Sequence, residues 1–267
     1  MIYKDVIENR EVVCVDNDGF LEGQDYQSII GIKYSSEFEV VRDINQYMYE
    51  IYDAIKVNKE DEVGKLIIGS YNKIHKSYQA AILCCSRGLE EQAKILIRTI
   101  LDKSMIATAV MRNPDNYNKW IEMQLFEKNR LITNIRDKKP GLEDFSLEES
   151  VQKSEKGRRI SQKNWADMAG MTADYYYIYT LFSGEVHLSA SSIEWDFGLD
   201  SDDSYMNLSP RTEETDVILL TLADYVMRFV EQLIAYFDIR NTRFGEIYTN
   251  LKMRQEEYKE REENRRK

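Results

Sequence analysis

Two stretches of the chain place reactive side chains at helical spacing. Tyr179, Ser183 and His187 follow one another at intervals of four residues, so on a helix they share one face. Histidine titrates near neutral pH, and both hydroxyls donate and accept hydrogen bonds. Glu185 can orient a neighbouring group, and Ser189 adds a further hydroxyl. The stretch therefore predicts an acid–base or binding site, with a hydrogen-bonded core histidine as the competing interpretation.

The second stretch carries Arg98 and Asp102 inside an apolar helix predicted over 89–112. The two residues are four apart and share a face of that helix. Buried charges are costly unless they are paired. One interpretation is an ion pair that fixes the register of the helix. In the other, Arg98 lines a cleft, where it binds an anion or polarises a substrate.

Five polar groups in two apolar helices are costly unless they meet one another or a ligand, so we expect the two stretches to meet. A binding or regulatory module would hold a small anionic ligand at this polar centre. Its predicted ligand-binding residues are Asp102, Ser183, Glu185 and Ser189. The alternative is metal-independent RNA cleavage, which needs a base, an acid and a cation. The predicted catalytic residues are His187, Tyr179 and Arg98.

Both stretches resemble the patterns of a large group of bacterial helical proteins defined as a domain of unknown function. The first pattern in that group is an Ala, a short apolar stretch and then Arg-x-x-x-Glu. It is matched here from Ala93 to Asp102, with Asp in place of Glu. The second is Tyr-x-x-x-Ser-x-x-x-His-x-Ser, matched from Tyr179 to Ser189. The resemblance covers about residues 71–239 and implies a helical fold, a hairpin and a long final helix, but no established activity.

A more distant resemblance is to HEPN proteins, which are small helical bundles of toxins and phage-defence systems. Their ribonucleases carry an Arg and, four to six positions later, a His on the same helix, and this sequence lacks that motif. An Arg and a His could be brought together only in space, with Arg98 and His187 contributed by different helices. The resemblance implies a role in phage defence or toxin biology, as a sensor or inhibitor, with an HEPN-like ribonuclease as the alternative.

Composition narrows the class of ligand. The formal net charge is −11, so a broad basic face for duplex nucleic acid is not expected, although a basic loop over 153–163 could contact RNA. Two histidines and no Cys-x-x-Cys predict no metal site and no cofactor. Three cysteines without a disulfide framework predict reduced thiols. No secretory signal or membrane span is recognisable, so we expect a cytoplasmic protein that does not enter the membrane.

The elements that must position these residues are helices. The chain has only 3 Pro and 12 Gly, and apolar residues recur at three- and four-residue spacing. This predicts a mainly all-α fold, a bundle of about six helices with two small β-hairpins near 11–28 and 193–208. The predicted helices cover about 35–55, 59–87, 89–112, 115–136, 164–189 with a break near Gly170, and 209–239. The predicted domains are an N-terminal β-hairpin extension (1–33), a helical-bundle domain (34–240) and a charged C-terminal helix or tail (241–267).

The last predicted bundle helix carries a long apolar stripe. Its members are Val217, Leu220, Ala223, Met227, Val230, Leu233 and Ile234. The stripe predicts a homo-oligomer, or a protein partner, bound through the C-terminal half. The competing interpretation is that it completes the core of the monomer. His75 lies among lysines, which predicts a surface position.

Overall fold

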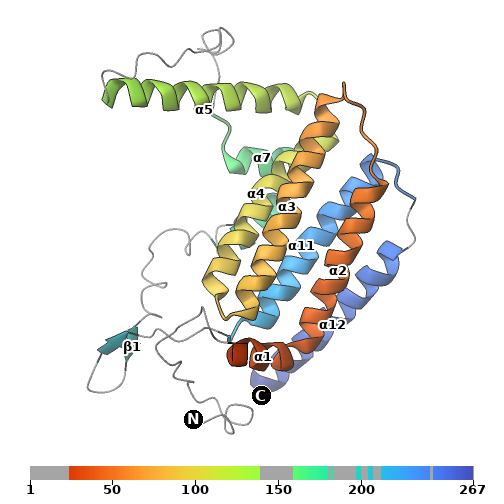
Figure 1. The fold of residues 1–267 in the computed structure, drawn as a ribbon, viewed down its shortest axis with the longest axis vertical. Helices are drawn as coiled ribbons and strands as arrows, with labels where there is room; N and C mark the ends of the chain where they lie inside the picture. The colour runs from red at the N-terminus through yellow and green to blue at the C-terminus, as the bar shows by residue number, and fades with distance from the viewer. Residues whose placement is uncertain are drawn as a thin grey trace. The chain divides into compact units, whose positions relative to one another are not determined.

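A computed structural model describes residues 24–138, 159–179, 182, 197–199, 204–206, 212–240 and 243–266. These residues contain nine α-helices, more than the six or so that the sequence predicted, and the mainly α-helical class is confirmed. The long helices are α2 (Ser35–Ala54), α3 (Glu62–Ser86), α4 (Glu90–Arg112), α5 (Asn116–Lys138), α11 (Thr215–Tyr236) and α12 (Arg243–Arg266) (Figure 1). The short ones are α1 (Gln24–Lys33), α7 (Gln162–Ala169) and α8 (Thr172–Asp174), and a π-helix follows at Tyr175–Tyr179.

The prediction of two β-hairpins is not confirmed as it was made. Residues 24–28, within the first predicted hairpin, belong to helix α1, and 11–23 lie outside the described residues. Within the second range, two three-residue strands pair antiparallel, β1 (Phe197–Leu199) with β2 (Ser204–Met206). The N-terminal hairpin was predicted because the turn-forming residues 16–19 suggested a strand that returns after them. This prediction was wrong for 24–28, because 24–33 forms a helix.

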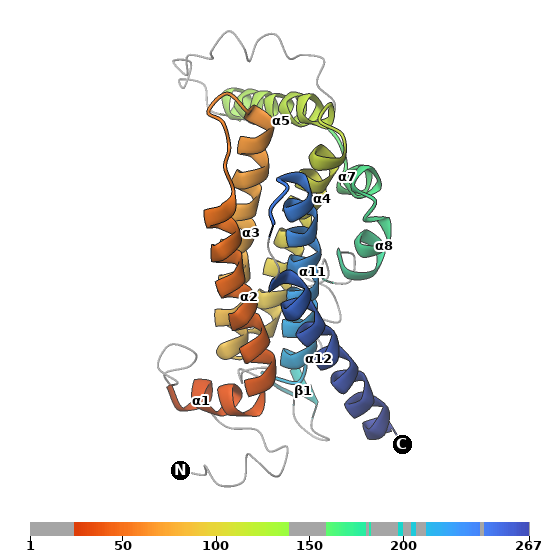
Figure 2. The same cartoon turned by 90° about the vertical axis from the view of Figure 1, so that its right-hand side faces the viewer.

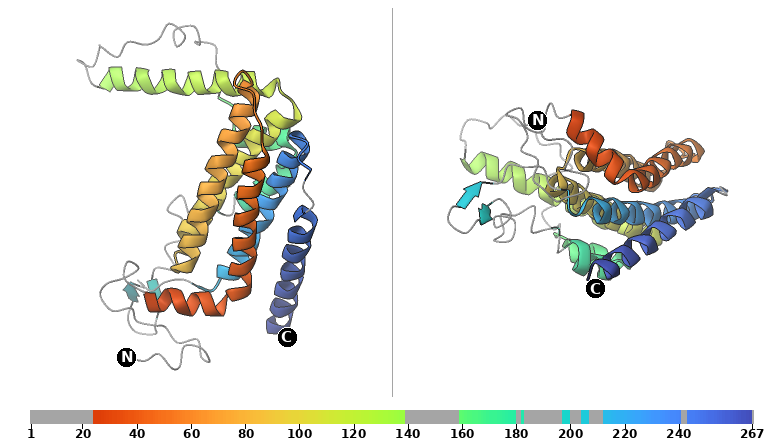
Figure 3. Two further views of the ribbon diagram at one scale, coloured as in Figure 1. Left: turned by 45° about the vertical axis from the view of Figure 1, so that its right-hand side comes forward. Right: turned by 90° about the horizontal axis from the view of Figure 1, so that it is seen from below.

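The chain divides into two compact units. Unit 1 consists of Met1–Lys56, Tyr71–Leu101 and Ile178–Lys267, and unit 2 of Val57–Ser70 and Asp102–Tyr177. In unit 1, helices α2, α11 and α12 lie side by side, and each contacts the other two (Figures 2 and 3). The apolar side chains that recur at helical spacing on α2 face inward. Its buried side chains include Val40, Val41, Ile44, Met48 and Ile51.

Helix α11 supplies the largest part of that core. Thirteen of its residues are buried, including Leu220, Met227 and Leu233 from the apolar stripe. The stripe therefore completes the core of unit 1 and does not form an exposed face for a partner. The oligomeric state itself stays a prediction. None of the helices in the described parts of the chain is long and apolar enough to span a membrane.

In unit 2, helix α7 has well-defined ends. The Ser161 hydroxyl accepts a hydrogen bond from the backbone N–H of Asn164 at 3.2 Å, which caps the start of the helix. Gly170 ends it with a φ of 68°, a left-handed conformation that favours glycine. Trp165 on this helix is fully buried. The helix break that the sequence predicted near Gly170 is thus confirmed, because the local turn chemistry alone determines it.

Candidate functional site

The structure brings two of the predicted site residues, Arg98 and Tyr179, into contact within unit 1. The Nη2 of Arg98 donates a hydrogen bond to the Tyr179 hydroxyl at 2.8 Å, across 81 positions of sequence. The guanidinium carbon also lies 4.7 Å from the centroid of the tyrosine ring. Tyr179 is 9% exposed and Arg98 is half-buried. The geometry holds the guanidinium of Arg98 in one orientation at the edge of the core.

The inner nitrogen of Arg98 has spare hydrogen-bonding capacity. Its Nε is buried and donates to no acceptor among the described residues. Arginine presents its N–H groups as a rigid fork that matches carboxylate and phosphate oxygens. A buried N–H without an acceptor typically costs about 1–3 kcal/mol. An anion at this position would provide the missing acceptor.

Tyr179 is the last residue of the π-helix Tyr175–Tyr179. The wider turn of a π-helix is often found at functional sites. The other tyrosines of this segment do not all pack in a core, because Tyr176 is 53% and Tyr177 76% exposed. Only Tyr179 at the end of the segment is buried. The π-helix thus directs one of its aromatic side chains to Arg98 and leaves two at the surface.

The remaining predicted site residues divide into two groups. Asp102 lies one turn beyond Arg98 on α4 and is half-buried. His187, Ser183, Glu185 and Ser189 lie outside the described residues. Their roles stay predictions. The described residues contain no group of three or more His, Cys, Asp or Glu side chains that could hold a metal ion.

The same face of α4 carries two further polar residues that the sequence analysis missed. Glu90 and Lys94 precede Arg98 at intervals of four residues, and they are only 1% and 7% exposed. One carboxylate oxygen of Glu90 accepts hydrogen bonds from the Glu214 backbone N–H at 2.9 Å and the Thr215 hydroxyl at 2.7 Å. The Lys94 ammonium lies 2.5 Å from the Glu214 carboxylate. The sequence signal was present, since charged residues recur every fourth position from Glu90 onward.

Glu90 caps a helix other than its own. Glu214 precedes α11 and provides no side-chain cap, so the Glu90 carboxyl group satisfies the first N–H there instead. Burial raises the pKa of Glu90 to about 7, and the nearby carboxylates of Glu213 and Glu214 add to this. The hydrogen bonds from Thr215 and Glu214 act in the opposite direction but do not cancel the effect of burial. Glu90 therefore changes its charge near neutral pH.

Comparison with known protein families identifies the family of this chain. A family described as being of unknown function, DUF5677, matches residues 64–205, which is just over half of the 267 residues. The chain belongs to the DUF5677 family. The match includes both Arg98 and Tyr179, and it confirms the predicted resemblance to a family of unknown function, but not the HEPN resemblance. Comparisons with curated proteins and with solved structures gave no match.

Within the DUF5677 region, His75 corrects another prediction. It is 7% exposed and not a surface residue. Its ring centroid lies 4.6 Å from that of Tyr49 and 6.3 Å from that of Tyr71. Its Nε2 lies 2.8 Å from the Oδ1 of Asn45, which also accepts from Gln79 at 3.0 Å. This histidine of α3 is therefore a core residue that is hydrogen-bonded to α2. Its burial lowers its pKa.

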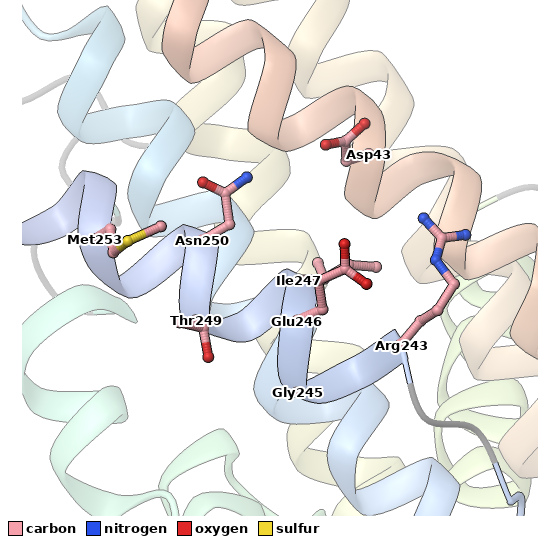
Figure 4. A pocket seen from close by; sticks show the side chains of 8 residues that line it. All are labelled: Asp43, Arg243, Gly245, Glu246, Ile247, Thr249, Asn250 and Met253. Atoms are coloured by element: carbon pink, nitrogen blue, oxygen red, sulfur yellow. The ribbon is translucent and has the colours of Figure 1, made fainter.

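A hollow lies outside the DUF5677 region, between α2 and α12 (Figure 4). It has a volume of about 440 Å³. Its lining residues are Asp43, Arg243, Gly245, Glu246, Ile247, Thr249, Asn250 and Met253. Arg243 is already paired with Glu50 on α2. The lining has mixed charge and contains neither Arg98 nor Tyr179, so the Arg98–Tyr179 pair is the better candidate site.

Proposed function

We propose that this DUF5677 protein is a helical binding or regulatory module that binds a small anionic ligand at Arg98. The observation that carries the proposal is the state of the Arg98 guanidinium. One nitrogen is held by Tyr179 at 2.8 Å, while the buried Nε has no acceptor among the described residues. A fork oriented in advance loses little side-chain entropy when it binds a carboxylate or phosphate.

The surroundings of Arg98 support an anion over a cation. Lys94 lies one turn earlier on the same face of α4 and contributes positive charge, although it is paired with Glu214. The ring of Tyr179 lies against the guanidinium and keeps it from turning toward solvent. An ion-paired arginine would need a protein carboxylate as its partner, and among the described residues the partner of Arg98 is the hydroxyl of Tyr179. This supports a role for the guanidinium in binding an anionic ligand.

Calorimetric titration with inorganic phosphate tests the proposal. We expect saturable binding to the full chain, reduced at least about tenfold by Arg98→Gln. Arg98→Lys should recover only part of the affinity, because an ammonium group cannot replace the fork. Tyr179→Phe should weaken binding by less, since it removes only the orienting hydroxyl. Arg42→Gln on the exposed side of α2 is the matched control and should bind like the original chain.

The outcome that contradicts the proposal is equally specific. Binding that is unchanged in Arg98→Gln, or absent for phosphate, sulfate and acetate alike, removes the anion site. Circular dichroism of each variant separates loss of the site from loss of the fold. If Arg98→Gln fails to fold, the comparison between Arg98→Lys and Tyr179→Phe still decides the question, since both retain polar or aromatic bulk.

An HEPN-like ribonuclease is the second candidate, and one contact favours it. Arg98 and Tyr179, two of the three predicted catalytic residues, touch each other. With His187 as general base, the site would cleave RNA without a metal ion. The test is cleavage of a labelled RNA in the presence of EDTA. A His187→Ala protein that is stable and equally active contradicts this candidate. The biological setting in phage defence or toxin regulation, the cytoplasmic location and the homo-oligomer stay predictions.

A further inference from the structure

Helix α12 is attached to unit 1 by little apolar surface. Of its side chains that the structure describes, only Ile247 (6% exposed) and Leu251 (0% exposed) are buried. A half-buried Phe244 adds a ring contact with Tyr47 of α2, with 6.5 Å between the centroids. A helix of 24 residues that packs through its apolar face normally buries a stripe along its whole length. The fully buried apolar side chains among those described for α12 lie within 243–251.

Ion pairs provide the rest of the attachment. Arg243 pairs with Glu50 of α2, Lys252 with Asp224 of α11 at 2.7 Å, and Arg261 with Glu37 of α2 at 2.7 Å. The three cationic side chains are 40%, 45% and 46% exposed. Water and salt reach Arg243 and Lys252, so their pairs contribute little and weaken as ionic strength rises. The Glu37 carboxylate is only 2% exposed, so its pair with Arg261 is screened less and is the firmest of the three. Beyond Leu251, ion pairs therefore form a large part of the attachment, beside a half-buried Tyr258.

Two features of the contact with α2 weaken it further. The hydroxyl of Tyr47 is buried and has no hydrogen-bond partner among the described residues. A hollow of about 440 Å³, lined by Asp43 of α2 and by residues of α12, runs along part of this contact (Figure 4). A close-packed interface has neither orphaned hydroxyls nor large gaps.

The helix also has internal ion pairs that support it apart from this contact. Arg254 pairs with Glu257 at 2.9 Å and Lys259 with Glu256 at 2.6 Å, both three residues apart within α12. Such pairs stabilise an isolated helix. We propose that α12 is a releasable helix, which separates from α2 and α11 as a unit while the rest of unit 1 stays folded. Rising salt promotes the release, which uncovers Tyr47 and the sides of α2 and α11 beneath α12.

Hydrogen exchange measured by mass spectrometry on the full chain tests the release. In about 50 mM NaCl, peptides from 243–266 should exchange at least about tenfold faster than those from α11, because their opening is local. Raising NaCl to about 500 mM should accelerate exchange in α12 several-fold and leave α11 unchanged. Arg261→Gln should accelerate exchange in α12, since it removes the partner of Glu37. Tyr47→Phe should slow it, because the orphaned hydroxyl is gone.

Lys259→Gln is the matched control. It also replaces a cationic side chain of α12 by glutamine, but that side chain is 62% exposed and pairs with Glu256 of the same helix, so exchange should stay within about twofold of the original chain. The proposal is overturned if α12 and α11 exchange together at one rate, without response to salt or to Arg261→Gln. It is also overturned if Lys259→Gln and Arg261→Gln accelerate exchange equally, because the effect would then come from helix propensity and not from docking.

Discussion

Helices α11 and α12 both pack on α2, but they do so by different means. Thirteen residues of α11 are buried, whereas Ile247 and Leu251 are the buried residues among the described side chains of α12. Apolar burial scales with area and is not screened by salt, while exposed ion pairs are weak and screened. We therefore expect these two neighbouring helices to differ in stability. Helix α11 belongs to the buried core, whereas α12 adds two buried apolar side chains and a set of ion pairs.

The largest expected effect is a truncation in α11. Leu222→Ala removes a side chain with 0% exposure from the core and should lower the free energy of unfolding by about 3 kcal/mol. Leu251→Ala makes the same truncation at an equally buried site of α12. Its cost should be smaller, because it cannot exceed the free energy with which α12 is docked. Urea unfolding followed by circular dichroism measures both. Equal costs would show that the two helices belong to one cooperative core.

The next effect concerns the start of α11, where Glu90 is buried with a pKa raised from 4.5 to about 7. Between these pH values the unfolded chain is ionised while the folded protein keeps its proton, so unfolding releases a proton. Stability therefore falls as pH rises from about 4.5 to 7, by at most about 3 kcal/mol. Glu90→Gln should remove this dependence and be more stable than the original chain at pH 8.

Thermal unfolding between pH 5 and 8 checks the Glu90 prediction. Glu39→Gln, at an exposed site of α2, is the control and should retain the slope of the original chain. An unchanged slope in Glu90→Gln would mean that other groups cause it. Hydrogen exchange in α12 should not respond to Glu90→Gln, because Glu90 contacts the start of α11 and not α12.

A smaller effect is expected at the junction between the two helices. Asp238 has a φ of 48°, the left-handed region that glycine adopts without strain. Asp238→Gly should therefore be about 1 kcal/mol more stable than Asp238→Ala. Melting temperatures of the two variants measure this difference. An alanine variant as stable as the glycine variant would show that the junction is not strained.

The smallest effect is that of a single ion pair across the α11–α12 contact. A double-mutant cycle with Asp224→Ala and Lys252→Ala should give a coupling of about 0.5 kcal/mol in low salt, falling toward zero as salt is raised. Asp224 also pairs with Arg228 at 3.0 Å, and the cycle cancels that contribution. A coupling that persists at high salt would contradict the electrostatic description of α12.

Much of the fold could be read from the sequence because its signals are local. Apolar spacing located α2, α3, α4 and α11, and Gly170 marked a helix break. The predicted meeting of Arg98 with Tyr179 came from a different argument, that polar groups in apolar helices must find partners, and the contact is observed. The same argument applied to Glu90 and Lys94, whose spacing continues that of Arg98, would have indicated that they need partners, but not that the partners lie at the start of α11.

The errors share one physical origin. His75 stands among lysines in sequence, but α3 turns it toward Tyr49, and a residue's sequence neighbours do not determine which face of a helix is covered. The stripe on α11 has the same pattern whether it meets its own core or another chain. Only the positions of α2 and α12 decide between the two.

The sequence by itself determined where helices form and which of their faces are apolar, because both depend on residues within a few positions of each other. The tertiary structure decided which polar groups meet, with Arg98 on Tyr179 and Glu90 at the first turn of α11. It also decided that α11 buries thirteen residues, while α12 combines a few buried apolar side chains with ion pairs. These outcomes depend on contacts between residues far apart in the chain, and no local pattern of side chains specifies them.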